Sequence, residues 1–105
     1  MISAVFTAKG NTLTGFEISG HSGYAEEGQD IICAAVSSAA LMTVNTVTEI
    51  QKLSADIAVD DGFLKLDLSP KDAQTASVAL EGLRLHLTAL SQEHPQFINV
   101  TISEV

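Results

Sequence analysis

Two stretches near the start of the chain, residues 2–9 and 13–19, alternate between apolar and polar or small side chains. A period of two residues is typical of a β-strand that buries one face. Gly10 and Asn11 lie between the two stretches and are residue types that favour a tight turn. The pattern therefore predicts an antiparallel hairpin at the start of the chain.

The longest apolar segment, residues 31–53, repeats with the period of a helix. Asp30 directly precedes it and is expected to be the N-cap, because a short carboxylate accepts hydrogen bonds from the free N–H groups of the first turn. Residues 31–48 carry no charge and approach the length of a membrane span. Six Ser, Thr and Asn residues and the lack of basic flanks favour a buried helix in a protein that does not enter the membrane. Its expected core stripe consists of Ile32, Val36, Ala39, Thr43, Val47 and Ile50.

The second half of the chain repeats this succession of elements. Residues 57–59 and 64–68 alternate on either side of an Asp61-Gly62 pair, which is a strong signal for a hairpin. Ser69 and Pro70 then predict a helix start with a cap and an N1 proline. We expect this second helix to end near His94 and a fifth strand to cover residues 97–103. Its apolar stripe is Ala73, Ala76, Leu80, Leu83, Leu87 and Leu90.

The predicted order is β-β-α-β-β-α-β, which indicates a single two-layer α+β domain spanning residues 1–105, with a five-stranded mixed sheet and two helices. Periodicity does not decide which strands are neighbours. Two helices on one face of the sheet leave the other face in need of cover or of a polar surface. A homodimer is one way to provide that cover, and we expect one.

The charge balance narrows the class of partner. Thirteen acidic and five basic residues give a net charge of −8, so the chain lacks the basic cluster that a phosphate backbone requires. We expect no nucleic acid to bind, and a basic peptide or protein is the better partner. A single cysteine cannot form an internal disulfide, and the N-terminus lacks the pattern of a secretory signal. These features predict a cytoplasmic protein.

The candidate chemistry lies in residues 20–38, around Cys33 and His21. Cys33 is expected near the third position of its helix, where free N–H groups and the helix dipole favour a thiolate. His21 begins a glycine-punctuated loop that can bring an imidazole to the sulfur as a general base. The N–H groups of Cys33 and its neighbours are candidates to hold an oxyanion. The structural alternative is a small buried thiol and an unrelated surface histidine.

Metal and cofactor chemistry fits this stretch less well. His21, Cys33 and Asp30 could join Glu26 or Glu27 around zinc, but structural zinc sites prefer several thiolates or imidazoles. A phosphatase of the Cys-x5-Arg type would need arginine at position 39, which is alanine. We therefore expect no metal and no cofactor. The two remaining histidines, His86 and His94, are expected at the surface.

Residues 20–38, GHSGYAEEGQDIICAAVSS, closely resemble the signature of the Prp family of ribosomal-processing cysteine proteases. The resemblance implies endoproteolysis with His21 as general base and Cys33 as nucleophile. It implies as substrate a large-subunit ribosomal protein, number twenty-seven, made with a short N-terminal extension. Cleavage in that family follows an aromatic or bulky apolar residue and precedes a basic segment.

Further roles follow from the same resemblance. Asp30 matches an aspartate that either caps the helix or orients His21, and we favour the cap. Ser37 lies one helical turn beyond Cys33, and it either supports the site, contacts the substrate or only packs. Glycines at three positions are expected to act as hinges of a flap, with the catalytic pair apart until peptide binds; they are Gly20, Gly23 and Gly28. The alternative function is a non-catalytic, ribosome-associated module that binds a basic peptide.

Overall fold

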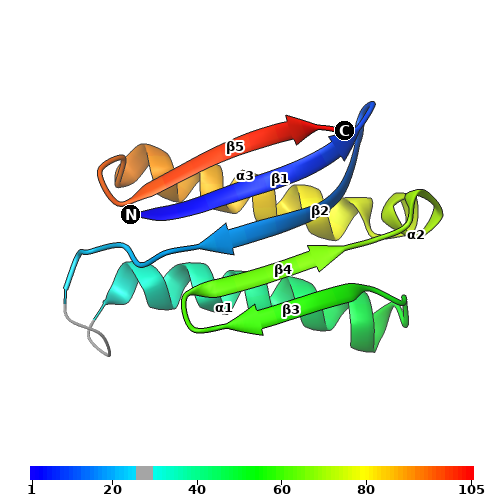
Figure 1. The fold of residues 1–105 in the computed structure, drawn as a ribbon, viewed down its shortest axis with the longest axis horizontal. Helices are drawn as coiled ribbons and strands as arrows, with labels where there is room; N and C mark the ends of the chain where they lie inside the picture. Colours follow the sequence, from blue (N-terminus) through cyan, green and yellow to red (C-terminus); the bar gives the residue numbers. More distant parts are fainter. Residues whose placement is uncertain (26–29) are drawn as a thin grey trace.

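All five strands that the alternating patterns predict are present in the computed structural model, which describes residues 1–25 and 30–105. They form one mixed sheet with the order β3-β4-β2-β1-β5. The strands are β1 (Ile2–Lys9), β2 (Thr12–Ser19), β3 (Asp56–Asp60), β4 (Phe63–Asp67) and β5 (Ile98–Glu104). The helical elements are α1 (Ile31–Asn45), the π-helical turn η1 (Thr46–Ile50), α2 (Pro70–Thr75) and α3 (Ser77–Glu93). The helices cover one face of the sheet (Figure 1).

The strand neighbours, which periodicity left open, follow from how the two hairpins are joined. The β1–β2 and β3–β4 hairpins are antiparallel, as expected, and β2 pairs with β4 in the same sense. The last strand, β5, pairs in parallel with β1 at the opposite edge, with Ile2 beside Ile98. This arrangement confirms the predicted two-layer α+β class and places the end of β2 beside the β3–β4 turn.

The first helix is shorter than predicted. The regular α-helix ends at Asn45, and the π-helical turn η1 follows it directly. The prediction was a regular helix through residue 53. The Oγ1 atoms of Thr43, Thr46 and Thr48 donate to carbonyl oxygens four residues earlier, at 2.8–3.0 Å. Such back-bonding by β-branched residues disturbs the regular ladder of helix hydrogen bonds. As a result Ile50 is 76% exposed, and its predicted place in the core is wrong.

The second predicted helix is two helices. Ser69 caps α2 as expected, since its Oγ accepts from the Asp72 N–H, and Pro70 is its first residue. The backbone then breaks at Ala76, with φ −88° and ψ 2°, before α3 begins. Both Ala73 and Ala76 are fully buried, so the break lets α2 turn its small residues onto the sheet while α3 runs along it (Figure 1).

The core lies between the helices and the sheet, and most of the predicted stripes face it. On α1 the buried positions include Ala40 and Val44, whereas the predicted Ala39 is only partly buried. Within the part of the chain that the structure describes, one helical stretch, Ile31–Ile50, is long enough and apolar enough to cross a membrane, judged by length and composition alone. In this fold one side of the stretch packs against the core, on the face of the sheet that the helices cover (Figure 1).

The open face of the sheet is mostly polar, with Val5 and Phe63 among its apolar residues. Each strand turns its second set of side chains to this face, and Val5, Glu17 and Lys65 form one row across β1, β2 and β4. Charged and hydroxyl side chains solvate such a face without a partner. The uncovered face therefore gives no support to the expected homodimer, which stays a prediction.

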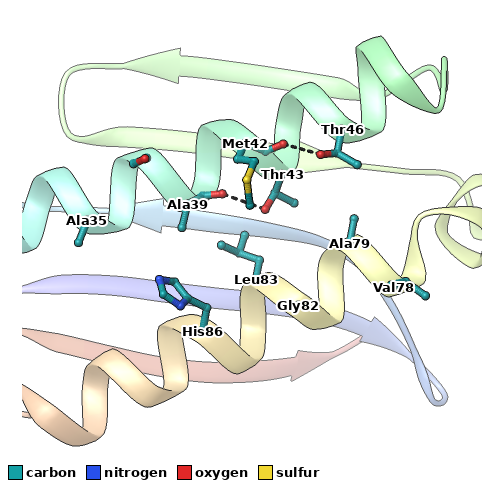
Figure 2. A pocket seen from close by; sticks show the side chains of 11 residues that line it. Ala35, Ala39, Met42, Thr43, Thr46, Val78, Ala79, Gly82, Leu83 and His86 are labelled. Carbon is teal, nitrogen blue, oxygen red and sulfur yellow. Dashed lines mark hydrogen bonds between the residues drawn. The ribbon is translucent and has the colours of Figure 1, made fainter.

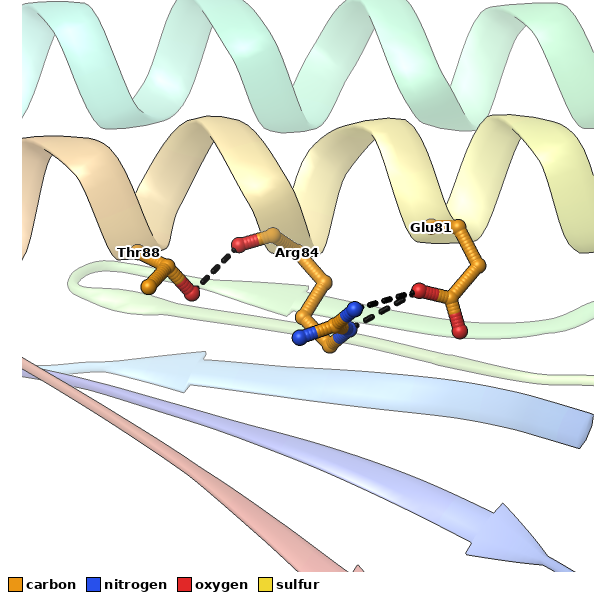
Figure 3. Close-up of polar contacts among 3 residues, drawn as sticks. All are labelled: Glu81, Arg84 and Thr88. Atoms are coloured by element: carbon orange, nitrogen blue, oxygen red, sulfur yellow. Dashed lines mark hydrogen bonds and ion pairs between the residues drawn. The ribbon is translucent and has the colours of Figure 1, made fainter. Parts of the chain in front are cut away.

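The few basic side chains are mostly engaged. Arg84 pairs with Glu81 on α3 through a 2.8 Å contact, and Thr88 donates to the Arg84 carbonyl oxygen (Figure 3). Lys65 and Lys52 also lie within 4.0 Å of carboxylates. Among the described residues, three of the five basic side chains thus have an acidic neighbour on the surface. The expectation of a basic partner stays a prediction.

Candidate active site

His21 is placed by the junction between β2 and the β3–β4 turn. Gly20, which directly follows β2, has φ +90° and donates its N–H to the Gly62 carbonyl oxygen at 2.8 Å. The imidazole of His21 lies directly against Gly62, because a Cβ added to that glycine would fall 2.9 Å from His21 Nε2. Gly62 itself has φ +65°, as an Asp-Gly turn requires. The β3–β4 turn thus packs against one side of the His21 imidazole and helps to fix its position.

Cys33 is placed by the start of α1, and Asp30 is the N-cap. Asp30 Oδ1 accepts from the N–H groups of Ile32 and Cys33, each at 3.0 Å. The Asp30 carbonyl oxygen accepts from the Ala34 N–H at 3.1 Å. The cap therefore fixes the third residue of the helix, Cys33, which is partly buried against the core.

This capping corrects one sequence-based expectation. The N–H of Cys33 was a candidate oxyanion donor, but it already donates to Asp30, as does the N–H of Ile32. A hydrogen bond to the cap competes with any bond to a substrate oxygen. The expectation that the Cys33 N–H is free is therefore wrong.

Asp30 also holds a residue that sequence reasoning missed. The Ser22 hydroxyl donates to Asp30 Oδ2, and its oxygen accepts from the Tyr24 N–H at 3.0 Å. The backbone N–H of Ser22 donates to Cys33 Sγ at 3.3 Å. Ser22 is next to His21 in the sequence, which was the one available signal that it would lie in the site.

The electrostatics of Asp30 follow from these contacts. The hydrogen bond from Ser22 is the largest influence and lowers the pKa of Asp30 from its ordinary value of 3.8, and the bonds from Cys33 and Ile32 act in the same direction. Burial acts against them. Asp30 therefore remains an ionised acceptor to lower pH than an ordinary aspartate. Among the described residues its partners are Ser22, Ile32 and Cys33, not His21, so the cap is the role that the geometry supports.

His21 and Cys33 line the same cavity, of about 240 Å³. Ser37, one turn after Cys33, and Asp61 of the β3–β4 turn line it as well. No hydrogen bond joins the imidazole to the sulfur among residues 1–25 and 30–105. The structure thus brings the predicted pair to one cavity without placing the two side chains in contact.

A second pocket, of about 200 Å³, adjoins this cavity and is mostly apolar. Four residues belong to both: Ile18, Val36, Ser37 and Gly62. Its outer rim includes the exposed side chains of Leu41 and Val59. Such a pocket is of the kind that takes an apolar side chain. Sequence reasoning did not find it because its walls come from α1, β2, β3 and β4.

The predicted hinges are only partly described. Gly20 and Gly23 have positive φ angles of 90° and 76°, which glycine adopts without strain. Gly28, Glu26 and Glu27 lie outside the described residues. The flap and its closure stay predictions.

Among the described residues there is no group of three or more His, Cys, Asp or Glu side chains that could hold a metal ion.

Neither of the other two histidines is among the described residues that line the Cys33 cavity. His86 is exposed, as expected, and lines an apolar groove of about 580 Å³ between α1 and α3 (Figure 2). His94 is only partly exposed. The described lining of this groove has no residue in common with the Cys33 cavity.

The sequence matches known proteins of one family. A family model described as cysteine protease Prp matches residues 1–99. A Bacillus subtilis (strain 168) protein named ribosomal processing cysteine protease Prp is 30% identical over 92 residues, which cover 82% of each chain. These matches confirm the resemblance seen in residues 20–38.

Solved structures share the whole fold. A crystal structure from Streptococcus mutans is 31% identical with a TM-score of 0.86, covering 100% of this chain and 96% of the other. The ribosomal processing protease Prp of S. aureus, solved with a covalently linked product peptide, has a TM-score of 0.91 at 24% identity, covering 98% and 100%. At that identity the likeness speaks for the fold alone. With a family match over nearly its whole length and its single cysteine at the start of α1, this chain belongs to the Prp family of cysteine proteases.

Proposed function

We propose that this chain is an endopeptidase that removes the N-terminal extension of large-subunit ribosomal protein twenty-seven. The observation that carries the proposal is the shared cavity, since the single cysteine and His21 both line it. The Bacillus subtilis relative is named for ribosomal processing. The net charge of −8, with Asp61 in the cavity wall, suits the basic segment that follows the cleavage point.

In the proposed reaction His21 takes the thiol proton of Cys33. The thiolate attacks the scissile carbonyl carbon, a C–S bond forms, and the carbonyl oxygen receives the negative charge. Collapse of this intermediate breaks the C–N bond, and the proton on His21 passes to the leaving amine. Water then attacks the thioester, His21 accepts its proton, and the carboxylic acid leaves as the thiolate is restored.

The direct test is incubation with the extended ribosomal protein, followed by mass spectrometry of the products. We expect one cut, after the aromatic or bulky apolar residue of the extension. Pretreatment with iodoacetamide should abolish it, because Cys33 is the single thiol. A protein that binds the precursor and leaves it intact would instead be the non-catalytic binding module.

We further propose that the pocket beside the cavity receives the apolar residue that precedes the scissile bond. Val59 lines this pocket and is 71% exposed, so we expect the Val59→Asp variant to keep the fold. The substitution places a charge where the apolar side chain of the substrate would bind. We expect KM for the extended peptide to rise about tenfold, with a smaller change in kcat.

The matched control for this substitution is Val78→Asp. Val78 is 83% exposed and lines the groove between α1 and α3, so this variant adds the same charge at a comparable surface. It should leave KM unchanged. An equal rise in KM for both variants would show a cause that does not depend on the pocket and would remove the pocket assignment.

A homodimer and a cytoplasmic location complete the proposal. The homodimer rests on the family resemblance, and the cytoplasmic location rests on sequence composition. Sedimentation equilibrium of the purified chain measures the first, and a monomer at micromolar concentration would exclude it.

A further inference from the structure

Ser22 makes hydrogen bonds to Tyr24, Asp30 and Cys33, and so links the loop after β2 to the start of α1. The residue is 3% exposed, although it follows the exposed His21 and precedes the exposed Gly23. Its hydroxyl donates to Asp30, eight residues away, and accepts from the Tyr24 N–H. A serine hydroxyl with both a carboxylate acceptor and an amide donor has little freedom to turn.

The consequence of this tether is the position of the Ser22 backbone. Its N–H donates to Cys33 Sγ at 3.3 Å. The N–H groups of Ile32 and Cys33 are both occupied by Asp30, so the helix start does not offer them to the sulfur. A donor directed at Sγ stabilises the charged form of a thiol more than the neutral form. The other titratable groups around Cys33 are His21 and Asp61 in the same cavity, and Asp30, whose carboxylate also contacts the Cys33 side chain and acts against the Ser22 donor.

We propose that Ser22 is a positioning residue: its hydroxyl, held by Asp30, keeps its own backbone N–H against Cys33 Sγ and so supports the thiolate. The inference rests on the proposed protease function and deepens it. The ionised state of Asp30 strengthens the tether, because a hydrogen bond to a charged acceptor is about twice as strong as a neutral one. Ser22 does not touch the substrate in this role and acts through its effect on Cys33.

The test variant is Ser22→Ala, which keeps the backbone N–H and removes the hydroxyl that holds it in place. The rate of Cys33 alkylation by iodoacetamide, measured from about pH 5 to 9, reports on the thiolate without any substrate. We expect the rate near neutral pH to fall about fivefold, the factor that one ordinary hydrogen bond supplies, and the profile to move to higher pH. With the extended peptide, kcat should fall by a similar factor while KM stays within about twofold.

Two further variants separate positioning from a general loss of structure. Ser22→Thr retains the hydroxyl and should restore the alkylation profile. Ser19→Ala removes a hydroxyl from the last residue of β2 and should change neither readout. In an Asp30→Asn background, Ser22→Ala should cost less than it does alone, because the two residues act through one contact.

A purely structural role would lower the melting temperature of Ser22→Ala and leave its alkylation profile unchanged, and that result would overturn the inference. If Ser22→Ala does not fold, the wild-type protein still decides the question. The amide proton resonance of Ser22 should then shift with the same midpoint pH as alkylation of Cys33, and a resonance that ignores this titration would refute the contact. The alkylation and resonance measurements need no substrate, so they test the role of Ser22 alone. A wild-type protein that does not cleave the precursor would refute the proposed function separately.

Discussion

Removal of either member of the proposed pair is expected to end useful proteolysis. Cys33→Ala should give no detectable cleavage of the extended ribosomal protein, because no other thiol is present to attack the carbonyl carbon. His21→Ala should lower kcat on the order of a thousandfold, within the range that a general base contributes. The measurement is the initial rate of product formation with saturating peptide.

The cause of the His21 effect can be separated from a loss of folding. His21 is exposed and its imidazole rests on the β3–β4 turn, so its removal should leave thermal stability nearly unchanged. His86→Ala is the matched control, since His86 is also exposed and lies in the groove between α1 and α3 (Figure 2). Full activity of His21→Ala, or an equal loss in His86→Ala, would exclude His21 as the base.

The second large effect is expected from a residue with no reactive group. Gly62→Ala should lower cleavage about a hundredfold, because the new methyl group would lie 2.9 Å from His21 Nε2 and displace the imidazole. The obstructing atom belongs to the free end of a side chain, so the imidazole can move aside while the turn persists. The stability cost should thus be only that of a positive φ angle, about 1 kcal/mol.

Gly10 provides the control for this substitution. It occupies the β1–β2 turn with φ +63°, nearly equal to the +65° of Gly62, and a Cβ added there meets nothing within 4 Å. Gly10→Ala should therefore share the stability cost and retain full activity. Similar activity in the two variants would mean that the contact of His21 with the turn has no catalytic importance.

Local interactions explain how much of the structure the sequence predicts. Asp30 caps α1 and Ser69 caps α2 because each needs only the N–H groups of the following turn. The Asp61-Gly62 hairpin and the alternating strands are equally local. The same holds for the place of Cys33 near the start of its helix, which the cap alone determines. The predicted helix lengths failed where threonine hydroxyls and a backbone break at Ala76 altered the regular repeat.

What only the tertiary structure decided is the contact between these local units. The sequence by itself placed His21 at the end of a strand and Cys33 at the start of a helix, but it left the distance between them open. Pairing of β2 with β4 brings the Gly62 turn under His21, and the bond from Ser22 to Asp30 draws the chain after His21 toward Cys33. These contacts depend on strand order and on loop closure, which no local period encodes. The residue types for the chemistry are therefore set by sequence, and their common cavity is set by the packing of the sheet against α1.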